Sequence, residues 1–461
     1  MQERPLYCRE DPFLHINHAK DCLQLAWHQG DLPDNPAQGA DDVMVFKAKE
    51  NLMKARPDLL DGKGPSGLEV IQLTTEAAVP SSHLYMEAQI FTPDSRRLIL
   101  HRSAHAHGSD PADPEHQYLI CSLEDDCQLT PITTETGATA PSVSPDGSTL
   151  YYFVDQTTLN GGRLILKKVG LDGSGRETLV TIDSLLPATG SQPSRPYPLS
   201  TISSDGKRIA LSAFLGDGET EDAPWGLLVF DVEQASVALV LHGQTWCNVH
   251  PQYSRSLDPE ASHDILVQEN HGNVCDTSGR NTRLAGGAGA DIHVVRDDGT
   301  HFRNLPWGRD GNEFCQGHQC WIGRSQRALT STSTRTPRSC RLIEARAVAH
   351  AGHAGLNTPD GQRNDLSRQI PHPDYYHFGT DIAGRRLITD AGPRDGGGAL
   401  YLGEIAEDEA APLASMRYLL NPRSSWEKGS HIHPFLSPDG RTGFFNSDES
   451  GILQAYLLRG W

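Results

Sequence analysis

The chain has 461 residues and a formal net charge of −19, because 59 acidic side chains outnumber 40 Lys and Arg residues. This balance argues against a nucleic-acid-binding surface, and an anionic substrate would need a local cationic group or a metal ion. No stretch approaches the roughly 20 apolar residues that span a bilayer, so we expect no membrane partner. The 44 Gly and 30 Pro residues are spread along the chain, which is typical of many short strands joined by turns.

The N-terminal segment, residues 1–75, is expected to complete or decorate a domain formed by residues 76–461. Its longest helix-like stretch runs from Asp41 to Leu60. The first residues, Met1 to Pro5, lack the basic and apolar regions of a signal peptide. We therefore expect either a cytoplasmic protein or a secreted or periplasmic one whose leader is absent from this chain.

A unit of turn plus strand recurs along the chain at intervals of about 50 to 60 residues. In the clearest unit, Ser437–Gly440 forms an Asp-Gly turn before the apolar strand Arg441–Phe445. The corresponding turn aspartates are Asp94, Asp146, Asp205, Asp381 and Asp439. The gap between Asp205 and Asp381 is about three times the others and therefore holds two degenerate units. Five visible and two inferred units predict an all-β fold, a seven-bladed β-propeller.

Histidines recur at one position of the strand that should line the propeller axis. His377 and His433 each lie seven residues before the turn glycine, and His250 and His318 take the matching place in the degenerate units. His431 lies two residues before His433, on the same strand face. Neutral imidazoles that converge at an axis can bind a metal ion. We predict a metal site of His250, His318, His431 and His433; alternatively, each histidine hydrogen-bonds a water or a backbone carbonyl.

A second histidine group lies in the first unit. His83 opens its inner strand, His101 ends the next strand, and His105 and His107 occupy the loop that follows. A histidine beside a substrate groove suits a general base, so His83 and His101 are candidates for proton transfer. His105 is a candidate for binding substrate, unless the loop is simply a solvated one.

Arg195 and Tyr197 begin the inner strand of the third unit. At the mouth of the axis a phenol can act as a general acid, and an arginine can hold a carboxylate. We therefore predict Tyr197 as an acid and Arg195 as a substrate-binding residue; the alternative is that Tyr197 is an ordinary packing aromatic.

Several motifs resemble those of the β-propeller polysaccharide lyases. Residues 246–251, 317–321 and 430–451 are similar to oligogalacturonate lyases, whereas residues 85–94 and 268–272 are similar to ulvan lyases. The first resemblance implies a manganese ion held by the histidines matching His318, His431 and His433, with the one matching His250 as the base. The second implies a catalytic His and Tyr pair, a neutralising arginine and a structural zinc.

The sequence departs from both patterns. Lys428 stands where the oligogalacturonate lyases have a glutamine ligand, which weakens the manganese assignment. Residues 210–213, Ala-Leu-Ser-Ala, occupy the strand where the neutralising arginine of ulvan lyases would be sought. The carboxylate-binding group therefore stays open between Arg195, Arg255 and other residues.

The sequence leads to one hypothesis and two alternatives. The first is a secreted or periplasmic lyase that cleaves an ulvan-type, uronate-containing polysaccharide by β-elimination, with zinc, or else manganese or calcium, as its metal. Its base would be His83 or His101 and its acid Tyr197. The alternatives are a cytoplasmic, manganese-dependent oligogalacturonate lyase with His250 as the base, and a non-catalytic TolB-like propeller that serves as a binding module.

Overall fold

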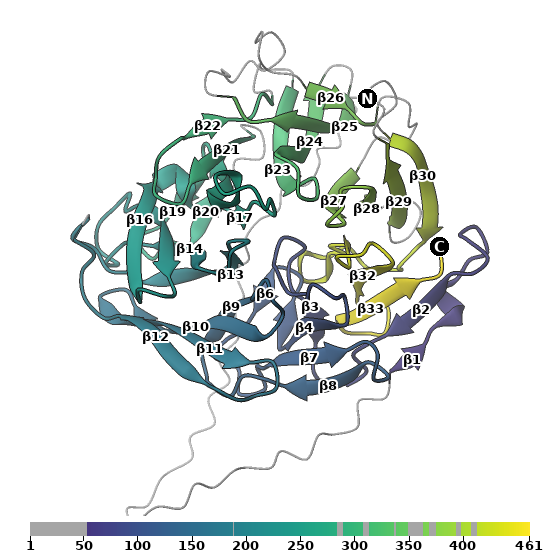
Figure 1. Cartoon of the computed structure of the whole chain (residues 1–461), viewed down its shortest axis with the longest axis horizontal. Helices are drawn as coiled ribbons and strands as arrows, with labels where there is room; N and C mark the ends of the chain where they lie inside the picture. Colours follow the sequence, from purple (N-terminus) through teal and green to yellow (C-terminus); the bar gives the residue numbers. More distant parts are fainter. Residues whose placement is uncertain are drawn as a thin grey trace, which may run out of the picture.

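The computed structural model describes residues 53–187, 189–283, 289–307, 313–335, 338–348, 363–367, 375–392, 398–406 and 413–461. These residues form seven antiparallel sheets arranged as blades around a central axis (Figure 1). The fold is therefore the all-β seven-bladed propeller that the repeats predict. No helix among the described residues has the length and apolarity needed to cross a membrane.

The first six blades each contain four strands that follow one another from the axis outward. Blade 1 consists of β3 (Ser81–His83), β4 (Arg97–Arg102), β7 (Tyr118–Ser122) and β8 (Gln128–Pro131). Blade 2 consists of β9 (Ala138–Val143), β10 (Thr149–Thr158), β11 (Gly161–Gly170) and β12 (Glu177–Ile182). Blade 3 consists of β13 (Arg195–Ile202), β14 (Arg208–Phe214), β15 (Trp225–Asp231) and β16 (Ser236–Gly243). Blade 4 consists of β17 (Gln252–Tyr253), β18 (Asp264–Asn270), β21 (Ala290–Arg296) and β22 (Arg303–Asn304). Blade 5 consists of β23 (Glu313–Trp321), β24 (Arg327–Arg335), β25 (Arg338–Arg346) and β26 (Arg363–Asp365). Blade 6 consists of β27 (Tyr375–Thr380), β28 (Arg386–Ala391), β29 (Ala399–Ile405) and β30 (Leu413–Leu420).

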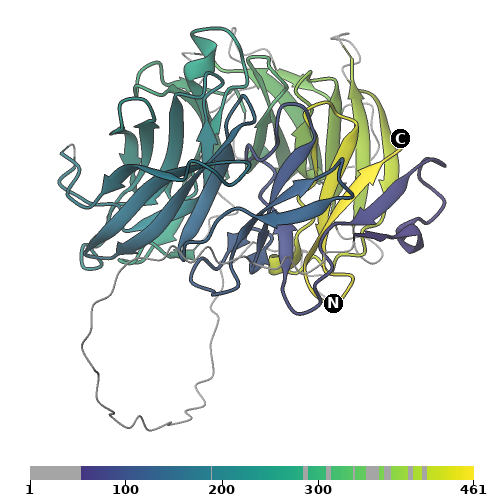
Figure 2. The ribbon, with the colours of Figure 1, turned by 60° about the horizontal axis from the view of Figure 1, so that its bottom comes forward.

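Blade 7 is assembled from two distant parts of the chain. Its inner strands are β31 (Phe435–Leu436), β32 (Thr442–Ser447) and β33 (Gln454–Arg459), and its outer strands are β2 (Glu69–Gln72) and β1 (Lys54–Ala55). Strand β2 pairs antiparallel with β33, so that Val70 lies opposite Leu458. Figures 1 and 2 show the purple β1 and β2 against the yellow β33. This pairing closes the ring.

The helix-like stretch expected between Asp41 and Leu60 does not form a helix in its described part. Residues 41–52 lie outside the described residues, and the remainder forms β1 and a short 3-10 turn, η1 (Pro57–Leu59). Strand β1 pairs with β2, and η1 ends after three residues. Pairing with the neighbouring strand has overridden the weak helical propensity.

The blades pack on one another through apolar side chains from successive sheets. Phe153 of blade 2 meets Phe230 of blade 3 edge to face, with ring centroids 5.0 Å apart, and both are fully buried. The Asp-Gly turns stack in the same way. Gly147 has a φ of +72°, and a Cβ atom there would lie 2.8 Å from the Pro93 ring of the preceding turn, so only glycine suits this position.

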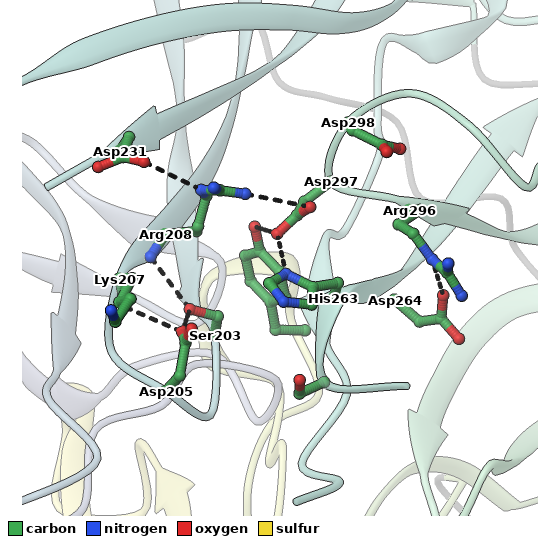
Figure 3. Close-up of polar contacts among 12 residues, drawn as sticks. Ser203, Asp205, Lys207, Arg208, Asp231, His263, Asp264, Arg296, Asp297 and Asp298 are labelled. Carbon is green, nitrogen blue, oxygen red and sulfur yellow. Dashed lines mark hydrogen bonds and ion pairs between the residues drawn. The ribbon is translucent and has the colours of Figure 1, made fainter. Parts of the chain in front are cut away.

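Charged side chains also join blades 3 and 4 at the turn end of the strands (Figure 3). Arg208 lies between Asp231 and Asp297, at nitrogen to oxygen distances of 3.3 and 3.4 Å. Asp297 in turn accepts hydrogen bonds from the Tyr253 hydroxyl, at 3.2 Å, and from His263 Nδ1, at 2.9 Å. One buried carboxylate, just after the end of β21, thereby joins β14 of blade 3 to β17 of blade 4.

Candidate active site and metal centre

The inner strands depart from regular pairing where the candidate side chains lie. The register of β13, β23 and β27 shifts at Tyr197, His318 and His377, respectively. In blades 4 and 7 the corresponding residues, His250 and His433, precede prolines and have positive φ angles of 45° and 44°. Bulges and left-handed residues re-aim side chains that a flat strand would point into the sheet packing.

Five histidines from four blades meet around the axis. His318, His377, His431 and His433 come from blades 5, 6 and 7, and His107 comes from an insertion in blade 1. The ring centroid of His377 lies 4.5 Å from that of His318 and 4.3 Å from that of His433. The potential ligand nitrogens of His107, His431 and His433 all lie within 4.8 Å of one another. We call these five residues the histidine cluster.

Hydrogen bonds orient two rings of the histidine cluster. The Nδ1 atom of His433 lies 2.8 Å from the carbonyl oxygen of Ala106, and that of His377 lies 2.8 Å from Asp390 Oδ2. When Nδ1 donates in this way, Nε2 keeps its lone pair and becomes a ligand atom. Nε2 of His433 and Nδ1 of His318 are buried and have no hydrogen-bond partner among the described residues.

Three rings of the histidine cluster, those of His318, His377 and His433, are held in the neutral form by burial and by repulsion from neighbouring imidazoles. Burial, and then the neighbouring imidazoles, lower the pKa values of His377 and His433 well below the ordinary value. Burial and the charges of His250 and His431 lower the pKa of His318 to about 3. Neutral imidazoles with inward lone pairs fit a divalent transition-metal ion.

His107 reaches the histidine cluster through a small hairpin, β5 (Ala104–His105) and β6 (Gly108–Ser109). The backbone N–H of Ala106 donates to the carbonyl of Gly429 at 3.0 Å, so the hairpin crosses from blade 1 to blade 7. His105 points the other way: it is exposed, and its Nδ1 accepts the backbone N–H of His107 at 3.2 Å. Of the two loop histidines, it is His107 that joins the cluster.

His250 is bound on both sides by side chains from other blades. Its Nδ1 atom lies 2.8 Å from Oε2 of Glu87, in blade 1, and its Nε2 atom lies 3.1 Å from the hydroxyl of Tyr197, in blade 3. The Tyr197 hydroxyl also donates to Asn248 Oδ1 at 2.8 Å. The carboxylate orients the imidazole, and the phenol lies at the other ring nitrogen, so we call Glu87, His250 and Tyr197 the proton-transfer group.

The surroundings of His250 shift the pKa values of both its partners upward. Burial raises the pKa of Glu87, although the charge and hydrogen bond of His250 act in the opposite direction. Burial, followed by the charge of Glu87, raises the pKa of Tyr197 well above its ordinary value. The phenol therefore keeps its proton at neutral pH and is available as a donor.

The other residues singled out in the first unit do not lie against Tyr197. The His83 ring packs edge to face on Phe435, at 4.5 Å, and burial lowers its pKa to about 4. His101 has Nε2 2.7 Å from the Ser82 hydroxyl and stacks on Tyr118. The structure thus brings Tyr197 together with His250, whereas His83 and His101 make packing contacts.

The two candidate arginines occupy different places. Arg195 is exposed at the start of β13, two residues from Tyr197. Arg255 donates from Nη1 to the carbonyl oxygen of Thr380 at 3.2 Å, and Thr380 ends β27, whereas His377 lies nearer its start. Of the two, Arg195 is the one that shares a strand with Tyr197.

Sequence reasoning missed several residues of the site. Glu87 lies within a motif similar to ulvan lyases but has no neighbour in sequence that would mark it as a partner of His250. His377 is one of the histidines that recur at the same inner-strand position, seven residues before Gly384. It could therefore have been included among the ligands. His107 could not, because only the course of its hairpin from blade 1 to blade 7 brings it to His433.

Comparisons with known proteins define the class as a propeller. No family model matches the chain, and no curated protein matches it. One similar solved structure is an oligogalacturonate lyase in complex with manganese, with a TM-score of 0.62, 15% identity, and coverage of 87% of this chain and 95% of the other. Another is an oligogalacturonate lyase from Vibrio parahaemolyticus, with a TM-score of 0.62, 16% identity, and coverage of 88% and 96%. At these identities the likeness establishes the fold.

Proposed function

We propose that this chain is a carbon–oxygen lyase that cleaves an acidic, uronate-containing oligosaccharide by β-elimination. The observation that carries the proposal is the His250 imidazole, held between Glu87 and Tyr197 and next to the histidine cluster. The oligogalacturonate lyases among the similar structures support pectic oligouronates as the substrate class. Ulvan is the second candidate, because Tyr197, the acid that the ulvan-lyase resemblance implies, contacts His250.

β-Elimination next to a uronate carboxylate needs a base, an acid and a group that neutralises the carboxylate. His250 serves as the base: Nδ1–H donates to Glu87, and Nε2, whose lone pair is free because the Tyr197 hydroxyl donates to Asn248, takes the proton from C5. Tyr197 serves as the acid: its proton passes to the glycosidic oxygen as the C4–O bond breaks and the C4–C5 double bond forms. The 3.1 Å contact then returns the proton from His250 to Tyr197, so both groups regain their starting forms.

The neutralising group would be a divalent cation in the histidine cluster. His107, His318, His377, His431 and His433 would supply the nitrogens, whereas His250 contacts Glu87 and Tyr197 and is kept for the base. A bound cation would withdraw charge from the substrate carboxylate and so acidify the C5 proton. The manganese of the similar lyase supports manganese as the first ion to test.

The test is a substrate panel followed by ultraviolet absorbance of the unsaturated uronate product. Pectic oligomers, ulvan and other polyuronates are incubated with the manganese-loaded protein. We expect absorbance to rise with pectic oligomers and to disappear in His250→Ala. Activity on ulvan alone would replace the pectic assignment by the ulvan one. No rise in absorbance with any uronate would overturn the lyase proposal and favour a non-catalytic propeller that serves as a binding module.

A further inference from the structure

Two adjacent strands of blade 4 present four ligand-type side chains on one face. Glu269 lies on β18, and His271 follows it by two residues. Asp291 and His293 are likewise two residues apart, on β21. Glu269 pairs directly with Asp291, and Val267 pairs with His293. Because residues two apart share a face and cross-strand partners share a side, this pairing makes the four side chains converge.

The side-chain atoms are close enough to share one ion. His271 Nε2 lies 2.7 Å from Asp291 Oδ2 and 3.5 Å from Glu269 Oε2. His293 Nε2 lies 3.2 Å from the same Glu269 oxygen. One ligand atom from each of Glu269, Asp291 and His293 lies within 4.8 Å of the other two. Asp291 and His293 are buried, and His271 and Glu269 remain partly exposed, so the group is open on one side.

A second layer of hydrogen bonds fixes this group. The Thr245 hydroxyl donates to Glu269 Oε1 at 2.7 Å, and His293 Nδ1 lies 2.7 Å from Asn304 Oδ1. If Nδ1 donates to Asn304, the lone pair of His293 Nε2 faces the Glu269 carboxylate. Two acceptors facing each other need a proton or a cation between them, and such outer partners orient ligands in metal sites.

We infer that Glu269, His271, Asp291 and His293 form a divalent-cation site separate from the histidine cluster. Two imidazoles and two carboxylates suit zinc, and a dication balances the two carboxylate charges. All four ligands come from the protein, which is the arrangement of a structural site. The inference concerns metal binding alone and does not depend on the proposed lyase activity.

The ion would fasten the root of a hairpin beside the active site. His271 leads into β19 (Val274–Cys275) and β20 (Asn281–Arg283). A Cβ atom on Gly279 of this hairpin would lie 2.6 Å from the Phe214 ring, so the hairpin packs on blade 3. Arg280 is close enough to act electrostatically on Arg195. The ion would therefore hold in place a segment that borders Arg195.

The test counts bound ions, with Co²⁺ as a spectroscopic probe and elemental analysis for zinc. In the His431→Ala/His433→Ala background, which disables the histidine cluster, we expect one equivalent of Co²⁺ with the visible absorption of a tetrahedral site. Adding Asp291→Asn should remove it. His271→Asn, at the exposed rim, is the milder variant and should weaken binding by about 10- to 100-fold.

The matched control is His263→Asn, which disrupts another histidine–carboxylate pair of blade 4, His263 and Asp297 (Figure 3). It should leave the equivalent of Co²⁺ unchanged. In the parent protein, chelation should speed proteolysis within residues 272–283, and Asp291→Asn should be cut fast with or without chelator. Undiminished Co²⁺ binding by folded Asp291→Asn or His271→Asn, or no binding in the His431→Ala/His433→Ala background, would overturn the inference.

Discussion

The Nε2 atom of His250 lies 3.1 Å from the hydroxyl oxygen of Tyr197, although the two residues belong to neighbouring blades and are 53 positions apart. Each residue also has a second partner, Glu87 for His250 and Asn248 for Tyr197. A four-residue chain of hydrogen bonds therefore runs across blades 1, 3 and 4. Its members are expected to act as one unit.

The first prediction concerns the coupling of His250 and Tyr197. His250→Ala and Tyr197→Phe should each lower kcat by about 10²- to 10⁴-fold, which is the range of general acid–base catalysis. The double variant should be little worse than the poorer single variant, because residues that act as a unit are not additive. Steady-state kinetics on pectic oligomers checks this. Losses that multiply in the double variant would contradict the shared role.

A second prediction separates the charge of Glu87 from its orienting role. Glu87→Gln keeps an oxygen that can accept from His250 Nδ1 but removes the negative charge that would stabilise a protonated imidazole. We expect kcat to fall on the order of 10²-fold with little change in KM. Glu135→Gln, in a distant ion-pair network, is the control. A variant with unchanged kcat would show that orientation alone is enough.

Removing the metal from the histidine cluster should lower thermal stability. A ligand that binds only the folded state adds about 3 to 4 kcal/mol at 100 to 1,000 times its Kd. In an Asp291→Asn background, which isolates the cluster, manganese should raise Tm, and His318→Ala or His431→Ala should abolish the rise. Differential scanning fluorimetry with and without chelator measures it. A manganese-dependent shift that survives both substitutions would place the ion elsewhere.

A fourth prediction concerns acid stability at the junction of blades 1 and 2. Glu135 lies 2.7 Å from Lys167 Nζ and 3.2 Å from Arg176 Nη1, and it accepts from the Tyr152 hydroxyl at 3.0 Å. Burial raises its pKa, but the hydrogen bonds and these charges outweigh burial, and the pKa falls to about 2. The carboxylate therefore stabilises the fold fully above its ordinary pKa, and this stability is lost as the pH falls from about 4.5 to about 2.

Glu135→Gln should accordingly cost about 1 to 2 kcal/mol at pH 7, since the partly exposed carboxylate keeps some hydration. The difference from the parent protein should shrink between pH 5 and pH 3. Urea unfolding at these pH values measures it. A difference that stays constant on acidification would show that packing, rather than charge, is responsible.

The fold could be predicted because the repeats are local. Five blades repeat the same kind of Asp-containing turn, as at Gly147 and Gly440, where a positive φ favours glycine. The inner-strand position of His377 follows from its distance to that turn, and those of His250 and His318 follow from aligning the two degenerate units with the clear ones. The pairing of β2 with β33 could not be predicted, because it joins segments without a shared repeat.

The candidate site was only partly predictable, because it depends on contacts between blades. The recurring inner-strand position predicted His318 and His433, and His431 lies two residues before His433. The structure gathers these three at the axis together with His107 and His377. The same recurring position led to the prediction of His250 as a metal ligand, whereas the hydrogen bonds of its ring are with Glu87 and Tyr197. Sequence spacing locates a residue along a strand, but a bulge or a left-handed φ decides which neighbour it meets.

Among the residues that the structure describes, the backbone at His250 and His433 occurs once more, without a histidine. Ala140 of blade 2 has a φ of +47°, precedes a proline and lies seven residues before the turn glycine, as His433 does. The left-handed conformation is therefore a property of the propeller scaffold and not of the imidazole. A scaffold that keeps this conformation with or without a reactive group can gain or lose chemistry one side chain at a time, so its evolutionary divergence need not alter the fold.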